Sequence, residues 1–297
     1  MLTSTQNGRL QKYYGTMEAV RMLKEAGFDA YDMTMCSLFG DHPSPLNGEN
    51  WREEAQKIRA YADSIGISCN QSHAIFPPVK GDVSDAERYE ALIRHLEISS
   101  ILGAKISVVH PIQYLGYAKN VEKLKEMNME FYRGLIPYCE KFNVKIAVEN
   151  MWQRYYNKSG NRIVDSVCSR AEEFCDYIDT LNSPWIVACL DIGHVSLVGE
   201  DMTRMIHALG PRLQALHVHD TDTCVDLHTL PFQGRIDFEE VTQALADIDY
   251  QGDITLEADS FYGTIPADQK AAHQAAAHYM AQITDTLRTM VQTKKQK

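Results

Sequence analysis

The sequence predicts an α/β protein whose 297 residues form one closed barrel of eight parallel strands and eight helices, a (β/α)8 barrel. Short β-branched segments alternate with longer segments of helical periodicity along the whole chain. No GxGxxG motif follows the first strand, which favours a barrel over a dinucleotide-binding sheet. No stretch rich in Pro, Gly or Ser divides the chain, so we expect a single domain over residues 1–297.

In the first half of the chain, four apolar runs predict strands, and the segments between them have the apolar spacing of amphipathic helices. The strands are expected at residues 2–5, 28–35, 67–73 and 105–111, and the helices at 16–26, 50–65 and 84–103. Gly27 and Gly66 follow the first two helices, at the position where a left-handed residue commonly ends a helix.

The same alternation continues in the second half. Strands are expected at residues 144–150, 185–191, 212–220 and 253–259, and helices at 120–142, 169–181, 201–209, 238–248 and 266–293. Strand sequences such as VKIAVEN are almost wholly apolar, which is typical of parallel strands buried on both faces. The segment WQRYYNKSGNR at 152–162 is expected to be a loop, and the terminal KKQK a solvated basic tail.

Charge and composition exclude several classes of function. The net charge of -11 and the pI near 5.5 argue against nucleic acid as a partner, because a phosphate-binding surface needs many cations. The 7 cysteines are scattered and form no CxxC motif, which indicates reduced thiols in a cytoplasmic protein. No apolar stretch has the length of a secretion signal or a membrane span, so we expect no membrane association. Assembly into a homo-oligomer stays open.

Side chains that commonly bind metals end the last six expected strands. They are His73, His110, Glu149, Asp191, His217 and Glu257, in chain order. In a (β/α)8 barrel the C-terminal ends of the strands converge on one face, which carries the active site. We therefore expect these six side chains to meet in one polar site.

Each of these residues also has a purely structural interpretation. A single histidine is often a hydrogen-bonded core residue, and Asp191 is suited to cap the turn that follows it. Glu149 and Glu257 are harder to explain, because a carboxylate that ends an apolar strand is costly to bury without a cation or a metal. His217 and His219 lie two residues apart on one face of a strand, so both are candidates to point into the barrel.

Three carboxylates and one imidazole form an oxygen-rich site suited to one divalent metal ion, Mn²⁺, Mg²⁺, Co²⁺ or Fe²⁺, with Zn²⁺ as an alternative. Such an ion polarises the carbonyl of a sugar and acidifies the neighbouring C–H bond. Two glutamates on opposite sides of the sugar can then remove and return that proton. The residues thus predict proton transfer next to a ketone, through an enediolate.

Five motifs in a fixed order carry a resemblance to a known family. They are AVEN with Glu149, LDIGH with Asp191 and His194, LHVHD with His217, DLHTLPFQGRIDF with Asp226 and His228, and LEAD with Glu257. Over roughly residues 16–261 the chain resembles the xylose-isomerase-like sugar isomerase/epimerase barrels. That superfamily also contains ketose 3-epimerases, inosose dehydratase, hydroxypyruvate isomerase and the endonuclease IV type of DNA-repair enzyme.

The resemblance implies a TIM-barrel sugar isomerase or epimerase with a small-molecule sugar substrate. Its metal ligands would be Glu149, Asp191, His217 and Glu257, and the two glutamates would also be the catalytic acid and base. His217 is preferred to His219 because the family's ligand lies three residues before an acidic residue, here Asp220. The substrate-binding residues would be His73, His110, His194, His219, His228 and Trp152, and the segment with Asp226 would close over the site.

The sequence also departs from the ketose 3-epimerase pattern. Tyr155 and Thr223 occupy the positions of a glutamate and an arginine, and PFQG replaces PGxG in the closing segment. These differences leave the metal core intact and put a ketohexose substrate in doubt.

Two alternatives share the same residues. The first is an endonuclease IV-like zinc phosphodiesterase acting on abasic DNA, because the chain offers every side-chain type of a three-zinc cluster. Those residues are His73, His110, Glu149, Asp191, His194, His217, Asp226, His228 and Glu257. The acidic charge balance and the lack of clustered Arg and Lys in the rim loops argue against it. The second is a metal-dependent keto-sugar or keto-cyclitol dehydratase, since loss of water can follow the same enediolate.

Overall fold

A computed structural model describes residues 1–40, 42–77, 83–157 and 160–296 of the chain. The barrel strands are β1 (Thr3–Thr5), β2 (Ala30–Thr34), β3 (Ser68–His73), β4 (Ile106–Val109), β5 (Lys145–Glu149), β8 (Ile186–Asp191), β9 (Leu213–His217) and β10 (Ile254–Leu256). The α-helices are α1 (Gly8–Tyr14), α2 (Thr16–Ala26), α3 (Trp51–Ile65), α4 (Val83–Leu102), α5 (Val121–Phe142), α6 (Ala171–Leu181), α7 (Ile192–Leu197), α8 (Met202–Leu209), α9 (Phe238–Asp247) and α10 (Lys270–Lys295). Short 3-10 helices are η1 (Pro45–Asn47), η2 (Tyr117–Lys119), η3 (Gly210–Arg212) and η4 (Asp259–Thr264).

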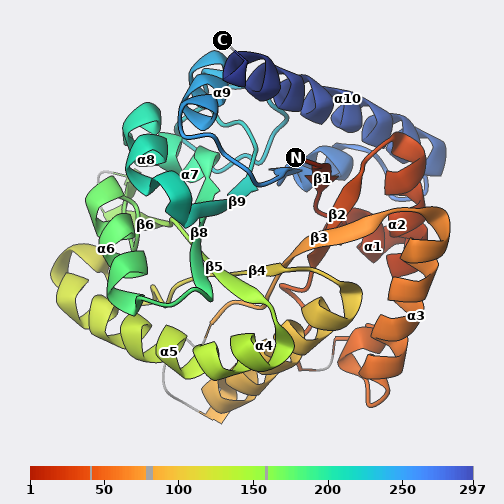
Figure 1. Ribbon diagram of the computed structural model, residues 1–297, viewed down its shortest axis with the longest axis horizontal. Helices are drawn as coiled ribbons and strands as arrows, with labels where there is room; N and C mark the ends of the chain where they lie inside the picture. The colour runs from red at the N-terminus through yellow and green to blue at the C-terminus, as the bar shows by residue number, and fades with distance from the viewer. Residues whose placement is uncertain (41, 78–82, 158–159, 297) are drawn as a thin grey trace.

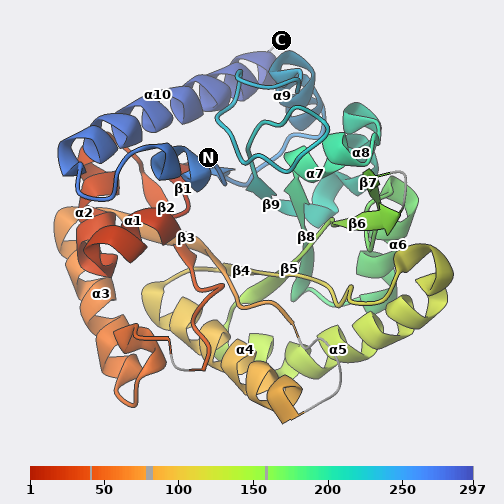
Figure 2. The same ribbon diagram turned by 180° about the vertical axis from the view of Figure 1, so that it is seen from behind.

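Within the described residues, eight parallel strands close into a ring (Figure 1). Six of them pair in the order β2-β3-β4-β5-β8-β9, and β1 pairs with β10. Two further bridges complete the ring: Gln6 pairs with Asp32, and Val218 pairs with Leu256. The long helices surround the strands, as Figures 1 and 2 show from opposite sides. The expected (β/α)8 barrel is therefore confirmed.

Several helix ends follow the local sequence. Gly27 and Gly66 take positive φ angles of 104° and 75° just past α2 and α3, as the sequence predicts, because glycine adopts this conformation without strain. Asp201 caps α8 by accepting a hydrogen bond of 2.6 Å from the backbone N–H of Arg204. No helix in the described part of the chain combines the length and the apolar character that crossing a membrane requires.

Several segments differ from the sequence-based expectation, among them the short helix α7, which the sequence does not predict. The sequence predicts a loop at residues 152–162, but residues 152–157 and 160–162 lie in two antiparallel strands, β6 (Trp152–Asn157) and β7 (Gly160–Asp165); residues 158 and 159 lie outside the described part of the chain. The helix α1 was not expected, because seven residues are too few to show a period. The first two residues of the expected KKQK tail belong to α10, which continues to Lys295, and Lys294 donates a hydrogen bond of 2.8 Å to the carbonyl of Glu239; Lys297 lies outside the described residues.

Candidate metal centre

Four of the site residues lie on the inward-facing side of the barrel strands, each two residues after a small apolar residue on the same side. Side chains two residues apart point to the same side of a strand. The rows pair Val108 with His110, Ala147 with Glu149, Cys189 with Asp191 and Ala215 with His217. The first member of each pair belongs to one small apolar cluster, and the second is a buried polar residue at or just after the C-terminal end of the strand. A floor of small apolar side chains therefore supports a polar layer, where the sequence predicts one.

Four side chains form the centre of this layer. Ligand atoms of Glu149, Asp191, His217 and Glu257 all lie within 4.8 Å of one another. His217 Nδ1 is 2.9 Å from Glu149 Oε1 and 3.1 Å from Glu257 Oε2. Protein ligands lie about 2.0–2.3 Å from a bound divalent ion, so two ligands of one ion are separated by at most about 4.6 Å. The four expected ligands thus come together close to the spacing that one ion needs.

Unpaired buried atoms in the centre also fit a metal. Glu149 Oε2 and Glu257 Oε2 are buried and have no hydrogen-bond partner among the described residues. Glu149 Oε2 lies 2.6 Å from His110 Nε2, but not in the geometry of a hydrogen bond. Buried carboxylate oxygens without partners are costly, and a cation among them would remove that cost.

The charges of the central residues are strongly coupled. Burial opposes ionisation of Glu149, but the imidazoles of His217 and His110 outweigh it and hold the pKa of Glu149 well below its ordinary value. His217 and His228 lower the pKa of Glu257 in the same way, against the effect of burial. For His217, burial lowers the pKa, whereas Cys189, both glutamates and Asp32 raise it well above its ordinary value. Both glutamates are therefore carboxylates at neutral pH.

A second group lies beside the centre and shares Glu149 with it. It consists of His73, His110 and Glu149, whose ligand atoms also lie within 4.8 Å of one another. The two imidazoles approach each other to 3.0 Å between their Nε2 atoms. His73 Nδ1 contacts the thiol of Cys36 at 2.8 Å, and burial is the main reason why the pKa of His73 is lowered.

A third group contains His194, His219, Asp226 and His228. Asp226 Oδ2 accepts hydrogen bonds from His228 Nε2 at 3.1 Å and from Trp152 Nε1 at 3.3 Å. His194 Nε2 lies 3.5 Å from the same oxygen. Burial lowers the pKa of His194, but Asp191, Asp226 and Glu149 raise it to about 10. The group is thus a carboxylate surrounded by imidazoles.

The structure places His217 and His219 differently. His217 points at both glutamates, as expected of a ligand. His219 is fully buried, binds Asp191 through Nε2 at 3.0 Å and stacks on His228 with 4.1 Å between ring centroids. His219 does not line the cavity above the centre, so its expected contact with substrate could only be indirect.

Four supporting residues were not found from the sequence. Gln6 Nε2 donates a hydrogen bond of 2.6 Å to Glu257 Oε1. Gln71 Nε2 donates one of 2.8 Å to Asp32 Oδ2, and that oxygen lies 3.6 Å from His217 Nε2. Asn150 holds Asp191 through two backbone hydrogen bonds, of 2.8 Å to its N–H and 2.9 Å to its carbonyl. Gln6 directly follows β1, Asp32 lies within β2, Gln71 lies within β3, and Asn150 directly follows Glu149. A polar residue inside or at the end of an otherwise apolar strand is the sequence feature that could have identified them.

An open cavity of about 660 Å³ lies above the centre. Its lining includes Glu149 and Glu257 together with five of the expected substrate-binding residues, His73, His110, His194, His228 and Trp152. Phe76 and Tyr114 add aromatic surface, and Arg154 and Gln153 come from the hairpin. The cavity therefore joins an aromatic wall to a row of imidazoles over the carboxylates.

Comparison with known proteins identifies relatives over most of the chain. A D-psicose 3-epimerase of Enterocloster bolteae is 31% identical over 244 residues, which cover 78% of this chain and 72% of the relative. An L-ribulose-5-phosphate 3-epimerase, UlaE, of Escherichia coli is 24% identical over 266 residues and 86% of each chain. The chain spans about half the length, 51%, of another relative, the uncharacterized protein y4fM of Sinorhizobium fredii.

Solved structures and a family model agree on the fold. The crystal structure of IOLI protein with a bound zinc atom matches with a TM-score of 0.75 at 18% identity, covering 99% of both chains. The family model described as xylose isomerase-like TIM barrel matches residues 20–283. Two of the relatives named above are sugar epimerases. The chain therefore belongs to the xylose isomerase-like TIM barrel family.

Proposed function

We propose that this protein is a divalent-metal-dependent sugar isomerase or epimerase that moves a proton next to the carbonyl of a ketose or a related keto-sugar. One observation carries the proposal: two buried carboxylates, Glu149 and Glu257, flank His217 at the floor of the open cavity. Each carboxylate keeps one oxygen without a hydrogen-bond partner among the described residues. The sugar epimerases among its relatives support the same reaction class.

The metal ligands in this proposal are Glu149, Asp191, His217 and Glu257, whose spacing and unpaired oxygens fit one ion. When bound, the ion polarises the carbonyl and an adjacent hydroxyl of the sugar. Residues that are not ligands hold the ligands in place by hydrogen bonds: Asn150 orients Asp191, and Gln6 holds one oxygen of Glu257. Such supports keep the ligands in place before substrate arrives.

The two glutamates exchange the proton. Their lowered pKa values keep both as carboxylates at neutral pH, so either can accept a proton from the carbon beside the carbonyl. The other glutamate takes a proton from solvent and gives it to the resulting enediolate, and the first glutamate releases the proton it accepted to solvent, so that both are carboxylates again. Protonation on the opposite face inverts that carbon, and protonation of the neighbouring carbon moves the carbonyl.

The remaining cavity residues position the sugar. His194 and His228 present imidazole groups beside Asp226, and Trp152 gives an aromatic face. Hydroxyl groups of a sugar both donate and accept hydrogen bonds, which suits a wall of imidazoles and carboxylates. The aromatic ring covers the apolar C–H face of the sugar.

The test is solvent exchange in D₂O. The purified, Mn²⁺-loaded protein is incubated with a panel of ketoses, and deuterium next to the carbonyl is detected by NMR. Glu257→Gln and Glu149→Gln should each abolish exchange while the fold is retained in circular dichroism. Glu173→Gln, a matched change at a partly buried glutamate on α6, should leave exchange unchanged. Retained exchange in Glu257→Gln would remove that residue from the acid/base pair.

A second candidate, a three-zinc phosphodiesterase, is favoured by one specific observation. The three ligand groups all lie in the structure, with Glu149 shared by two of them. Against it, Arg154 is the only Arg or Lys among the described residues that line the cavity, which is little positive charge for a nucleic acid. Metal analysis and an abasic-DNA cleavage assay separate the two: we expect one ion per chain and no cleavage.

A dehydratase would use the same centre and the same first proton transfer. It differs in its product, because loss of water leaves a dehydrated keto-sugar or keto-cyclitol. Mass spectrometry of the exchange reactions therefore tests it directly: we expect deuterated ketoses of otherwise unchanged composition, and a loss of 18 Da, about one water, would favour the dehydratase.

A further inference from the structure

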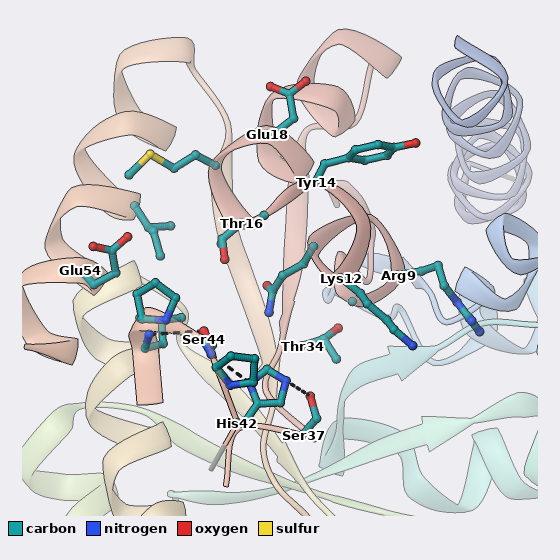
Figure 3. Close-up of a pocket in the computed structure, with 18 of the residues that line it drawn as sticks. Arg9, Lys12, Tyr14, Thr16, Glu18, Thr34, Ser37, His42, Ser44 and Glu54 are labelled. Atoms are coloured by element: carbon teal, nitrogen blue, oxygen red, sulfur yellow. Dashed lines mark hydrogen bonds between the residues drawn. The ribbon is translucent and has the colours of Figure 1, made fainter. Parts of the chain in front are cut away.

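The cavity above the metal centre is open on the side of α1. There it adjoins a second cavity of about 1050 Å³, which is lined by α1, the start of α2, the segment after β2 and one face of α3 (Figure 3). The two cavities meet after β2, where Cys36 lines the first and Ser37 lines the second. This side therefore leaves space beside a bound sugar, so the position of the sugar has to be set from another side.

Across the ring from α1, the hairpin of β6 and β7 lies outside the barrel strands (Figure 2). Residues 111–117, which follow β4, lie beside it. We call the hairpin and residues 111–117 together the side wall. Gln113 and Tyr114 line the cavity from the second segment, and Trp152 and Arg154 line it from the hairpin. Within the described residues the side wall pairs with no barrel strand, so its position depends on other contacts.

The side chain of Gln153 joins the two segments of the side wall. Its Nε2 donates hydrogen bonds to the carbonyls of Gln113, at 2.5 Å, and of Leu115, at 2.8 Å. Its Oε1 accepts a hydrogen bond of 3.0 Å from the N–H of Tyr117. These backbone groups belong to alternate residues, as they do along one edge of a β-strand, so the amide takes the place of a neighbouring strand. The reverse orientation of the amide would set its oxygen against two carbonyls.

Two further side chains anchor residues 111–117. Gln113 Oε1 accepts a hydrogen bond of 2.7 Å from the hydroxyl of Ser166, which directly follows β7. Asn128 of α5 binds the N–H of Ile112 at 2.7 Å and its carbonyl at 2.9 Å. Tyr114 lies between these anchored residues, and its exposed ring lines the cavity. The ring therefore takes its place from the backbone on either side of it.

Gln153 also lines the cavity, but its amide is already occupied. Both of its N–H groups donate to backbone carbonyls, and its oxygen keeps one free lone pair. A sugar hydroxyl that replaced one of the two carbonyls would leave that carbonyl without its partner, which is costly. The amide is thus suited to hold the side wall rather than to bind the sugar.

We propose that Gln153 is a positioning residue of the sugar site. By holding residues 113–117 against the hairpin, it fixes Tyr114 as the surface against which the sugar lies, on the side away from α1. The inference rests on the proposed function, because it takes a ketose at the metal centre as the substrate. It leaves the proton transfer between the two glutamates unchanged. Loss of the side wall weakens the binding of substrate and transition state alike, so it raises KM and leaves kcat nearly the same.

The test measures binding and turnover separately in Gln153 variants. Fructose, sorbose, tagatose, ribulose and xylulose are screened by calorimetry for binding to the Mn²⁺-loaded protein. The Kd of the ketose that binds most tightly is then measured for each variant, together with KM and kcat for deuterium exchange. Gln153→Met keeps the length of the side chain and removes all three hydrogen bonds. Gln251→Met is the matched control, because Gln251 is exposed and its amide also bonds a backbone carbonyl. Circular dichroism checks the fold of each variant.

We expect Gln153→Met to raise Kd and KM about tenfold or more and to change kcat less than about threefold, because it removes three hydrogen bonds that do not touch the reacting atoms. Gln251→Met should leave all three values unchanged. Unchanged Kd and KM in Gln153→Met, or a fall in kcat without a rise in KM, overturns the inference.

Gln153→Glu gives a readout that a loss of folding stability alone would not give. Its ionised carboxylate accepts from the N–H of Tyr117 but cannot donate to the two carbonyls, whereas the protonated form regains one donor. The Kd of Gln153→Glu should therefore be raised as in Gln153→Met at about pH 9 and should move back toward that of the unaltered protein at about pH 6, because the carbonyls raise the pKa of the new carboxyl group. A Kd ratio that stays constant over this range contradicts the proposed hydrogen bonds.

Tyr114→Ala tests whether Gln153 acts through the ring of Tyr114. It should raise Kd by a similar factor, and the double variant with Gln153→Met should raise it no further, because both changes remove the same contact. Independent factors that multiply overturn the inference, and so does an unchanged Kd in Tyr114→Ala, even if Gln153→Met does not fold.

The two proposals fail in different ways. Exchange that Gln153→Met leaves untouched would refute the role of Gln153 and leave the proposed function standing. A weakened Kd in Gln153→Met without exchange in the unaltered protein would support the side wall and refute the proton transfer. Binding of none of the five ketoses would refute both.

Discussion

Replacement of Asp32 by asparagine tests how the barrel supports the proposed metal ligand His217. Asp32 is fully buried in β2, and its Oδ2 lies 3.6 Å from His217 Nε2. Gln71 holds the carboxylate from the other side at 2.8 Å. With Nδ1 of His217 directed at the glutamates, the carboxylate of Asp32 faces the Nε2 side of the ring and acts on it through its negative charge. Such a partner fixes the ring and increases its basicity as a ligand.

The size of the effect follows from two opposing contributions. Loss of an outer partner of a ligating histidine typically weakens metal binding about 10- to 100-fold, or about 1.4 to 2.8 kcal/mol. Burial lowers the pKa of His217, but Cys189, the two glutamates and Asp32 together raise it, so Asp32→Asn should lower that pKa. A lower pKa reduces competition by protons, which partly restores binding at low pH. The deficit in affinity should therefore grow as pH rises.

The assay is competition for Mn²⁺ with a chelating dye between pH 6 and pH 9, about the range in which imidazole titrates. Gln71→Met serves as a second variant, which loosens the carboxylate without removing its charge and should give a smaller loss. Equal affinity of Asp32→Asn and the unaltered protein at the highest pH would refute the role of Asp32. So would a deficit that shrinks with rising pH.

Three further changes have outcomes that the structure sets. A Cβ atom at Gly193 would lie 2.0 Å from His219 Cε1, so Gly193→Ala should lower the free energy of unfolding, measured in urea, by about 1–3 kcal/mol and should weaken metal binding. An unchanged free energy of unfolding and metal affinity would contradict this close packing. Asn150→Ala removes both hydrogen bonds to the backbone of Asp191 and should lower the free energy of unfolding by about 2–4 kcal/mol in the same assay. A decrease below about 0.5 kcal/mol would contradict the supporting role of Asn150. Burial raises the pKa of Glu173 from 4.5 to about 7, so the folded state holds a proton that the unfolded chain releases, and stability falls as pH rises from about 4.5 to 7. Glu173→Gln should thus be up to about 3 kcal/mol more stable than the unaltered protein at pH 8 and equal to it at pH 4; no gain at pH 8 would refute the shift.

The sequence predicted the barrel well because its strands are buried on both sides. Such strands are almost continuously apolar, as VKIAVEN is, and the helices between them have a clear period. Parallel strands connected by helices place all their C-terminal ends on one face. Polar residues at those ends, Glu149 and Glu257 among them, could therefore be assigned to one place without any coordinates.

The parts that were missed depend on contacts that leave no periodic signal. The residues of β6 and β7 pair only with each other, outside the barrel, so no apolar run marks them. Gln6 and Asp32 support the centre across the seam where the ring closes, and a single buried Gln or Asp in a strand does not reveal its partner. The position of His219 beside Asp191 likewise depends on Gly193 in α7, whose missing side chain leaves room for the imidazole.

The number of bound ions decides whether Glu149 can take part in proton transfer. Its two oxygens face different partners: Oε1 lies 2.9 Å from His217 Nδ1, and Oε2 lies 2.6 Å from His110 Nε2. With one ion in the central group, one oxygen of Glu149 would bind it and the other would stay free to exchange a proton. A second ion between His73, His110 and Glu149 would engage both oxygens, and a carboxylate bound to two cations is too weak a base for this role. The acid/base role of Glu149 therefore requires that each chain bind one ion. A second tightly bound ion in the active protein would refute both the single-ion site and that role.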